Sequence, residues 1–149
     1  MNCHLPAPIR SVQYRVLYGD TDSGGVVYYG NYLRFFEIGR TEFLRDFGAS
    51  YRELEERGYI MPVVECSSRY KASARYDDLL TIETSLLEVK KYSCRFNHRI
   101  LRDNDGQLLV KGFTIHACTD LHGKLSRFPD YFQARLLAVT SGLSPLTQS

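Results

Sequence analysis

Two aspartates stand close together near the N-terminus, directly ahead of a glycine pair. Asp20 and Asp22 are followed by Gly24 and Gly25, by a short apolar and aromatic run, and by a segment with helical spacing. A carboxylate in this position lies beside the first turn of a helix, where the backbone N–H groups have no partners within the helix. A nucleophile or general base next to donors for an oxyanion is suited to attack on a carbonyl group.

The same residues also have a purely structural interpretation. An aspartate before glycine is a common turn former, and an acidic residue near a helix start is often only a cap. From the residues alone, a catalytic and a structural Asp22 remain equally open, whereas Asp20 is interpreted as a turn residue or a hydrogen-bond partner. Gly25 and Gly30 would let the backbone approach a bound substrate closely.

A long helix is predicted to follow the aspartates. The segment places large apolar residues and one glycine on a single helical stripe, namely Tyr32, Phe36, Gly39, Phe43 and Phe47. Arg40 and other polar residues are predicted to lie mostly on the opposite side. Asn31 fits the N-cap position, and Gly48 fits the position just past the C-terminus. Such an aromatic face needs a broad apolar surface to cover it.

The rest of the chain supplies strands for that surface. Strands are predicted over residues 9–18, 59–70, 79–90, 92–102 and 108–119, with Pro62 marking an edge, an end or a bulge. A capping box at Ser50 predicts a short second helix, and residues 128–139 predict a terminal one. The order favours an α+β fold, one curved antiparallel sheet wrapped around one long central helix. We expect a single domain over residues 1–149, with an ordered core at about 9–139 and frayed termini.

Composition narrows the class of protein. A chain of 149 residues that is 44% hydrophobic can bury a core without disulfides or metals. A net charge of +2 gives no reason to expect nucleic-acid binding, and we find neither a membrane-spanning stretch nor a signal peptide. We therefore expect a cytoplasmic protein whose four scattered cysteines are free thiols. An unpaired edge of the predicted sheet further favours self-association.

Residues 18–32, with the sequence YGDTDSGGVVYYGNY, resemble the signature of the 4-hydroxybenzoyl-CoA thioesterase family of hotdog-fold acyl-CoA thioesterases. They are also similar to the short-chain acyl-CoA thioesterases associated with the bacterial Tol-Pal system. The resemblance continues through residues 74–83, ARYDDLLTIE, and covers most of the chain. It implies a helix inside a five- or six-stranded antiparallel sheet, paired edge to edge into dimers and often tetramers, with the active site at the dimer interface.

The resemblance also implies roles for particular residues. It makes Asp22 the catalytic carboxylate and the backbone N–H of Tyr29 the main oxyanion donor, with Gly25 and Gly30 close to the substrate. The Tol-Pal-associated enzymes usually carry histidine where this chain has Tyr29, whereas the hydroxybenzoyl-CoA enzymes have tyrosine there. Tyr28 and Tyr29 are interpreted either as walls of an acyl pocket or as ordinary aromatic core.

A second candidate site is the predicted hairpin at Lys90, Lys91 and Tyr92. Such a lysine pair is most often a solvated hairpin tip. In the resembling enzymes, basic residues at this hairpin contact the nucleotide phosphates of coenzyme A, usually from the other subunit, and lysine suits phosphate as a mobile point charge.

Other groups of residues in the sequence do not indicate a metal site or a second catalytic site. His116, Cys118 and His122 have the donor types of a metal site but no clear fourth ligand, and His98 is predicted to be a buried histidine. The chain has no G-x-S-x-G elbow and no Walker or Rossmann glycine pattern. We expect no metal and no cofactor, because coenzyme A is part of the substrate.

Three functions remain open. The first is an acyl-CoA thioesterase with Asp22 as nucleophile or general base. The second is another hotdog activity, such as a hydratase or dehydratase on acyl thioesters, although no histidine lies between Asp20 and Gly48 to serve it. The third is a non-catalytic module that binds acyl-CoA. The acyl group could be aromatic, short aliphatic or longer.

Overall fold

The computed structural model describes residues 4–142, in which strands and helices follow the predicted order. The strands are β1 (Arg10–Arg15), β2 (Tyr59–Ile60), β3 (Val63–Tyr70), β4 (Leu79–Val89), β5 (Ser93–Arg102), β6 (Leu108–Ala117) and β7 (Thr119–Asp120). The helices are the 3-10 turn η1 (Tyr18–Asp20), α1 (Asn31–Asp46), α2 (Tyr51–Glu56) and α3 (Asp130–Thr140).

The main sheet is antiparallel and has the order β1-β4-β5-β6-β3. In β4 to β6 mostly buried and half-buried residues alternate, as expected of strands with one face on a core. Pro62 separates β2 from β3, and β2 pairs with β7 in a small second sheet. The predicted strand over residues 59–70 is therefore two strands, because proline cannot donate a hydrogen bond to a neighbouring strand.

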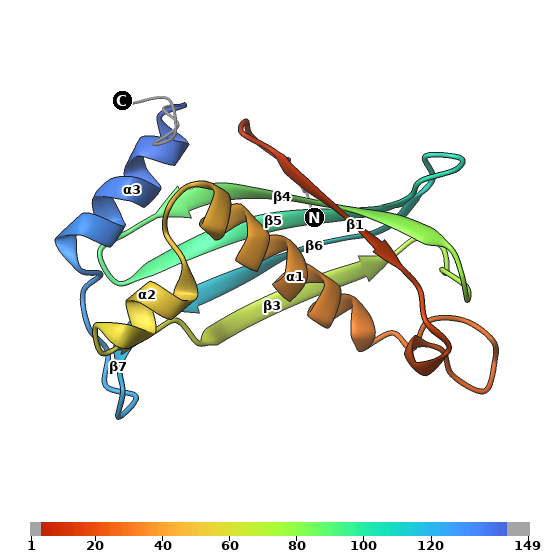
Figure 1. Ribbon diagram of the computed structural model, residues 1–149, viewed down its shortest axis with the longest axis horizontal. Helices are drawn as coiled ribbons and strands as arrows, with labels where there is room; N and C mark the ends of the chain where they lie inside the picture. Colours follow the sequence, from red (N-terminus) through yellow and green to blue (C-terminus); the bar gives the residue numbers. More distant parts are fainter. Residues whose placement is uncertain (1–3, 143–149) are drawn as a thin grey trace.

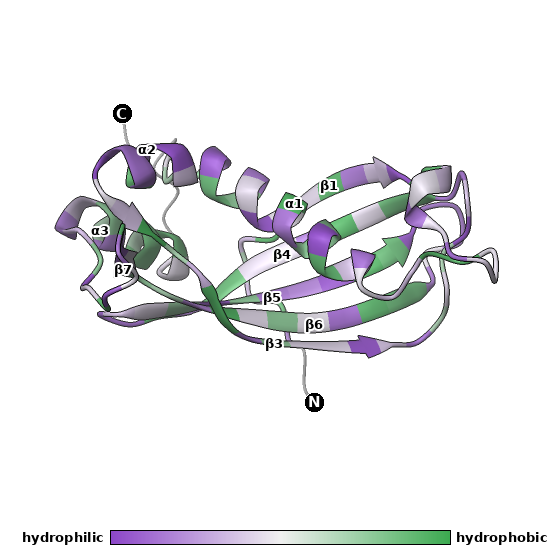
Figure 2. Ribbon diagram, turned by 90° about the horizontal axis from the view of Figure 1, so that it is seen from below, coloured by the Kyte–Doolittle hydropathy of each residue, from purple (hydrophilic) through white to green (hydrophobic). Residues whose placement is uncertain are grey.

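Helix α1 lies across one face of the curved sheet (Figures 1 and 2). Tyr32, Phe36, Gly39 and Phe43 of the predicted stripe are buried. Gly39 permits the close packing, because a Cβ atom there would overlap the Thr84 hydroxyl and lie 2.9 Å from Ile82 Cγ2.

The ends of α1 confirm one expectation and correct another. Gly48 has a positive φ of 72°, and the Ala49 N–H donates to the Leu44 carbonyl, so the helix ends in a Schellman motif. Asn31 does not cap the helix. Gly30 holds the N-cap position, and the Asn31 side chain instead donates to the Asp20 carbonyl at 2.8 Å.

Three helices, and not α1 alone, cover the sheet. Phe43 and Leu44 of α1, Leu54 of α2, and Phe132 and Leu136 of α3 belong to one buried cluster with residues of β4 and β5. The α+β class and the antiparallel sheet are as predicted, and the covering layer has more than one helix.

The N-terminal end of the predicted core differs from expectation. Residues 4–8 were predicted to fray, but Leu5 is buried and the His4 carbonyl accepts a hydrogen bond from Asn97. Residues 1–3 and 143–149, where further fraying was predicted, lie outside the described part of the chain.

Candidate active site

Asp22 lies at the head of a tight loop that its own carboxylate organises. Asp22 N–H donates to the Val26 carbonyl, and Thr21 bridges to Val27 across the loop. Asp22 Oδ1 accepts the N–H of Gly24 at 2.8 Å and that of Val26 at 3.4 Å. Oδ2 has no hydrogen-bond partner among residues 4–142, and the side chain is exposed. One oxygen is thus fixed by the backbone while the other remains available.

The N-terminus of α1 offers free donors close to this loop. The N–H groups of Asn31, Tyr32 and Leu33 donate to the carbonyls of Tyr28, Tyr29 and Gly30, respectively. Within the described chain, the N–H groups of Tyr29 and Gly30 have no such acceptor. The Tyr29 carbonyl also accepts the Tyr70 hydroxyl at 3.2 Å, which ties the helix entry to the end of β3.

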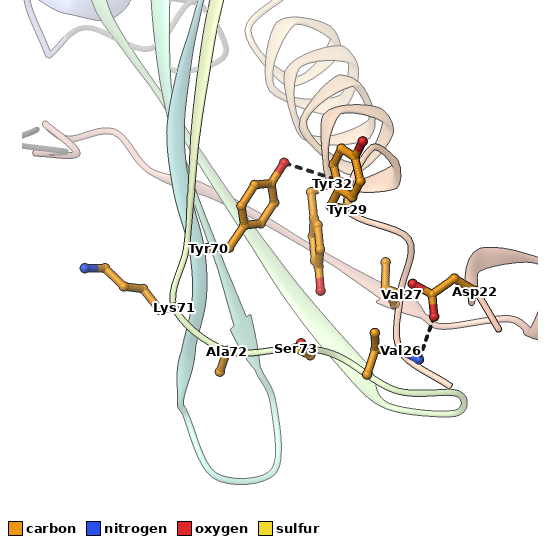
Figure 3. Close-up of a pocket in the computed structure, with 9 residues that line it drawn as sticks. All are labelled: Asp22, Val26, Val27, Tyr29, Tyr32, Tyr70, Lys71, Ala72 and Ser73. Atoms are coloured by element: carbon orange, nitrogen blue, oxygen red, sulfur yellow. Dashed lines mark hydrogen bonds between the residues drawn. The ribbon is translucent and has the colours of Figure 1, made fainter. Parts of the chain in front are cut away.

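Asp22 and Tyr29 line one pocket of about 310 Å³ (Figure 3). The other lining residues are Val26, Val27, Tyr32, Tyr70, Lys71, Ala72 and Ser73. In Figure 3 the Asp22 carboxylate and Lys71 stand on opposite sides of the pocket, with the two valines and the tyrosine rings between them. The pocket thus combines an apolar and aromatic wall with a carboxylate and a helix N-terminus.

Tyr32 shapes the inner wall of this pocket. Its hydroxyl accepts the Ala74 N–H at 3.1 Å, and burial raises the pKa of this phenol. The group is therefore a neutral positioning element that joins α1 to the segment after β3.

Asp20 has the structural role that the sequence suggested. It is buried, and its carboxylate accepts the Tyr14 hydroxyl at 2.7 Å, the Leu17 N–H at 2.9 Å and the Arg34 guanidinium. Burial raises the pKa of Tyr14. The hydrogen bond with Arg34 opposes this shift, and the hydrogen bond with the negatively charged Asp20 carboxylate adds to it. These contacts join β1, η1 and α1 beneath the loop that holds Asp22.

The other residues predicted near the substrate border the pocket without lining it. Gly25 adopts a φ of 79°, which the tight loop requires. Tyr28 is exposed and packs edge-on against the Tyr29 ring, with ring centroids 4.6 Å apart. Gly30, at φ −65°, needs no glycine for its conformation.

Lys90, Lys91 and Tyr92 lie at the other end of the sheet. They connect β4 to β5 beside α3, where the carbonyls of Lys90 and Lys91 accept hydrogen bonds from Gln133 and Phe128. The Asp22 loop instead bridges to Arg75, just ahead of β4. Because β4 has 11 residues, its ends are roughly 33 Å apart. One protomer therefore does not bring this hairpin to the Asp22 pocket.

Sequence reasoning did not identify Tyr70 to Ser73 as part of the pocket. Tyr70 ends the strand predicted over residues 59–70, residues 71–73 follow it outside any predicted element, and nothing in their spacing indicates a site. They reach the pocket because β3 pairs with β6 and ends opposite the start of α1.

The buried histidines form a separate network under α1. His98 and His116 each hydrogen-bond to Thr114, and neither residue lines the Asp22 pocket. In residues 4–142 no group of three or more potential ligands gathers at a metal site, and Cys66, Cys94 and Cys118 are free thiols. Within the same residues, no helix has the length and apolar character needed to cross a membrane.

Comparisons with known proteins agree on one family. The family model of the thioesterase-like superfamily matches residues 16–136. The chain is 41% identical over 116 residues to acyl-CoA thioesterase YbgC of Haemophilus influenzae, an alignment that covers 77% of this chain and 83% of that protein.

Solved structures show the same fold. DHNA-CoA thioesterase from Staphylococcus aureus superposes with a TM-score of 0.83 at 27% identity, covering 90% of each chain. A mutant of 4-hydroxybenzoyl CoA thioesterase, complexed with 4-hydroxybenzoyl CoA, superposes with a TM-score of 0.78 at 27% identity, covering 87% of this chain and 99% of that one.

Proposed function

The chain belongs to the thioesterase-like superfamily, and from this we propose that it hydrolyses an acyl-CoA thioester to a free acid and coenzyme A. The observation that carries the proposal is the pocket shared by Asp22 and the N-terminus of α1. It combines a carboxylate oxygen without a partner and backbone N–H groups without acceptors, within the described residues. Similarity to proteins named acyl-CoA thioesterases supports the same substrate class.

Asp22 supplies the reactive oxygen in this proposal. As a general base, Oδ2 takes a proton from water while the water oxygen bonds to the thioester carbon. The oxyanion that forms is held by the Tyr29 N–H, and its collapse breaks the C–S bond and releases the thiolate. As a nucleophile, Oδ2 itself bonds to the carbon and expels the thiolate, and water then hydrolyses the mixed anhydride. Oδ1, held by Gly24 and Val26, keeps the carboxylate oriented in both routes.

The remaining expectations belong to the same proposal. Gly25, Tyr28 and Gly30 lie around the acyl group, and Lys90, Lys91 and Tyr92 of a second protomer contact the coenzyme A nucleotide. The enzyme then acts in the cytoplasm as a homodimer or homotetramer, without a metal or a further cofactor. The separation of the hairpin from the Asp22 pocket within one protomer is what makes a second protomer necessary.

Two other functions fit less well. A hydratase or dehydratase would need an acid–base group such as histidine in the pocket, and the pocket lining contains Asp22 as its single carboxylate and no histidine. A non-catalytic acyl-CoA binding module would not need a free carboxylate oxygen. It remains the alternative that the following experiment distinguishes.

We expect Asp22→Asn to abolish most turnover while acyl-CoA binding persists. The amide oxygen can still accept the Gly24 N–H, so the loop should keep its shape, but the group no longer takes up a proton or attacks a carbonyl. Loss of general-base assistance alone should lower kcat by ~10²–10⁴-fold. Thiol release from a panel of aromatic, short and longer acyl-CoAs measures kcat, and calorimetry measures binding.

Asp20→Asn is the matched control, two residues away. It should lower the free energy of unfolding, because the Arg34 guanidinium would lose its buried anionic partner, and it should cost a smaller fraction of the rate. A folded Asp22→Asn protein with near-wild-type turnover on its best acyl-CoA would show that Asp22 is not catalytic.

A further inference from the structure

A second and larger pocket lies farther along α1, at Glu37, Arg40 and Thr41, whereas the Asp22 pocket lies at the N-terminus of this helix. It has a volume of about 550 Å³ and is enclosed by α1, α2 and the segment from β2 to the start of β3. Arg40 of α1 and Tyr51 of α2 line it together with the apolar side chains of Ile60, Met61 and Val63. None of these residues lines the Asp22 pocket, so the two pockets are distinct.

Arg40 is the unusual group in this pocket. It was predicted to lie on the solvent side of α1, but only 7% of the residue is exposed. Its Nε has no hydrogen-bond partner, and among residues 4–142 it forms no ion pair. A buried guanidinium remains charged and is costly unless an anion compensates it.

The positive charge of Arg40 affects the pKa values of nearby buried groups. It contributes, after burial, to lowering the pKa of His116 to about 4 and to lowering the pKa of His98. Burial raises the pKa of the Cys94 thiol to about 12, although Arg40 opposes this shift. The neutral histidines and the neutral thiol therefore offer the guanidinium no anion from the sheet side.

The rest of the pocket defines what anion would fit. The Tyr51 hydroxyl is buried next to the Arg40 guanidinium, which can only donate to it. Within the described residues the phenol proton has no acceptor, so the hydroxyl can donate to an anionic oxygen. The walls at Ile60, Met61 and Val63 suit an apolar body. Glu37 and Glu55 also line the pocket and are exposed, so they disfavour ligands with several negative charges, such as nucleotide phosphates.

We propose that this pocket binds the carboxylate of a small, largely apolar organic acid through the Arg40 guanidinium. The fork of N–H groups in arginine matches the two oxygens of a carboxylate, and the Tyr51 hydroxyl adds a third donor. This site does not depend on Asp22 and is expected to be occupied whether or not Asp22 is catalytic. If the chain releases a free acid as proposed above, an acid of this class is also its product.

The test uses benzoate as the probe and benzamide as the neutral control of the same shape. Benzoate should raise the melting temperature (Tm) of the wild-type protein by roughly 3–6 °C at about tenfold excess over its dissociation constant. Benzamide, and sodium chloride at equal ionic strength, should not. The Arg40→Met variant should fold, because replacing an uncompensated buried charge by an apolar side chain is often neutral or stabilising, and it should lose the benzoate shift. Arg40→Lys should keep a smaller one, because lysine lacks the fork.

Several outcomes would overturn the proposal. These are no benzoate shift in the wild type, an equal shift with benzamide, or a full shift in Arg40→Met. A fourth outcome is that benzoate has no effect on the wild-type protein and that Arg40→Met no longer self-associates. Arg40 would then bind a carboxylate of a second copy of the chain. Asp22→Asn should keep the benzoate shift, so a failure of the catalytic proposal and a failure of this one are told apart.

Discussion

Asp20 and Asp22 are two residues apart but have different surroundings. Asp20 is buried and accepts hydrogen bonds from Tyr14, Leu17 and Arg34, so its negative charge stabilises the junction of β1, η1 and α1. Asp22 is exposed in the adjacent pocket, with one oxygen free of partners in the described chain. Asp20 therefore anchors the surrounding elements, whereas the exposed Asp22 is the residue that we propose as the reactive group.

The two buried histidines, His98 and His116, are held by a continuous series of hydrogen bonds. The Met61 carbonyl can only accept, so His116 Nδ1–H donates to it at 3.2 Å, and His116 Nε2 accepts from the Thr114 hydroxyl at 3.0 Å. Thr114 Oγ1 therefore accepts from His98 Nε2–H, and His98 Nδ1 accepts from Thr84. Both rings must be neutral for this chain of hydrogen bonds to exist.

We expect the free energy of unfolding to fall as pH is lowered from about 6.5 to about 4. His116 titrates near 4 in the folded protein and near 6.5 in the unfolded chain. In this window the unfolded chain binds a proton that the folded protein does not, whereas above 6.5 the stability is independent of this group. The loss attributable to His116 is at most about 3 kcal/mol, and His98 adds to it in the same direction.

Urea unfolding followed by circular dichroism at several pH values measures this effect. His116→Gln should flatten the pH dependence, although it lowers stability at neutral pH. His122→Gln, at an exposed turn position, should leave the pH dependence unchanged. A wild-type protein with constant stability from pH 6.5 to pH 4 would contradict the neutral network.

At the scale of elements, the two ends of β4 lie at the two predicted binding regions. The loop that carries Asp22 packs near its start, and the hairpin of Lys90 and Lys91 follows its end. Both lysines are exposed, and among residues 4–142 Lys90 forms a single ion pair, with Glu88 at 3.1 Å. An exposed pair of this kind adds little to stability, so the lysines are free to meet an anion.

The double change of Lys90 and Lys91 to Ala should raise KM for acyl-CoA with little change in kcat. Removing contacts made equally in the ground state and the transition state gives this signature. Steady-state kinetics on acyl-CoA and on the matching acyl-pantetheine, which lacks the nucleotide phosphates, provide the comparison. Equal losses on both substrates would assign the hairpin a structural role.

For the whole molecule, the open edges of the sheet matter most. β1 and β3 are the edge strands, and β3 exposes Val63, Val64 and Tyr70. Tyr70 at one end of β3 lines the Asp22 pocket, and Val63 at the other end lines the Arg40 pocket. A second chain added along β3 would therefore border both pockets at once.

We expect the protein to sediment as a dimer or tetramer at micromolar concentration. An exposed apolar edge strand readily pairs with another chain, and a lysine on such an edge opposes pairing. Val64→Lys should shift the protein toward the monomer and lower its activity. Leu137→Lys, which places the same charge on the exposed side of α3, should do neither. A fully active wild-type monomer would exclude a site shared between protomers.

The sequence alone determined the features that depend on local spacing. The aromatic stripe of α1, the glycine that ends this helix at position 48 and the Ser50 cap of α2 are all indicated by residues a few positions apart. Pro62 indicated an edge, an end or a bulge without deciding among them. The spacing of the aspartates, the glycine pair and the helix start also indicated where a carboxylate would meet free N–H groups. Local geometry follows from local sequence because the hydrogen bonds involved span five residues or fewer.

Only the tertiary structure decided which distant residues share a site. Tyr70 and Lys71 join Asp22 because β3 ends opposite the start of α1, a placement that no spacing encodes. Arg40 is buried, against the helical pattern, because α2 and the β2–β3 segment close over the side of α1 that would otherwise face solvent. The burial of a helix face depends on what the rest of the chain packs against it. The spacing of apolar residues in a helix predicts only the face that packs on the sheet.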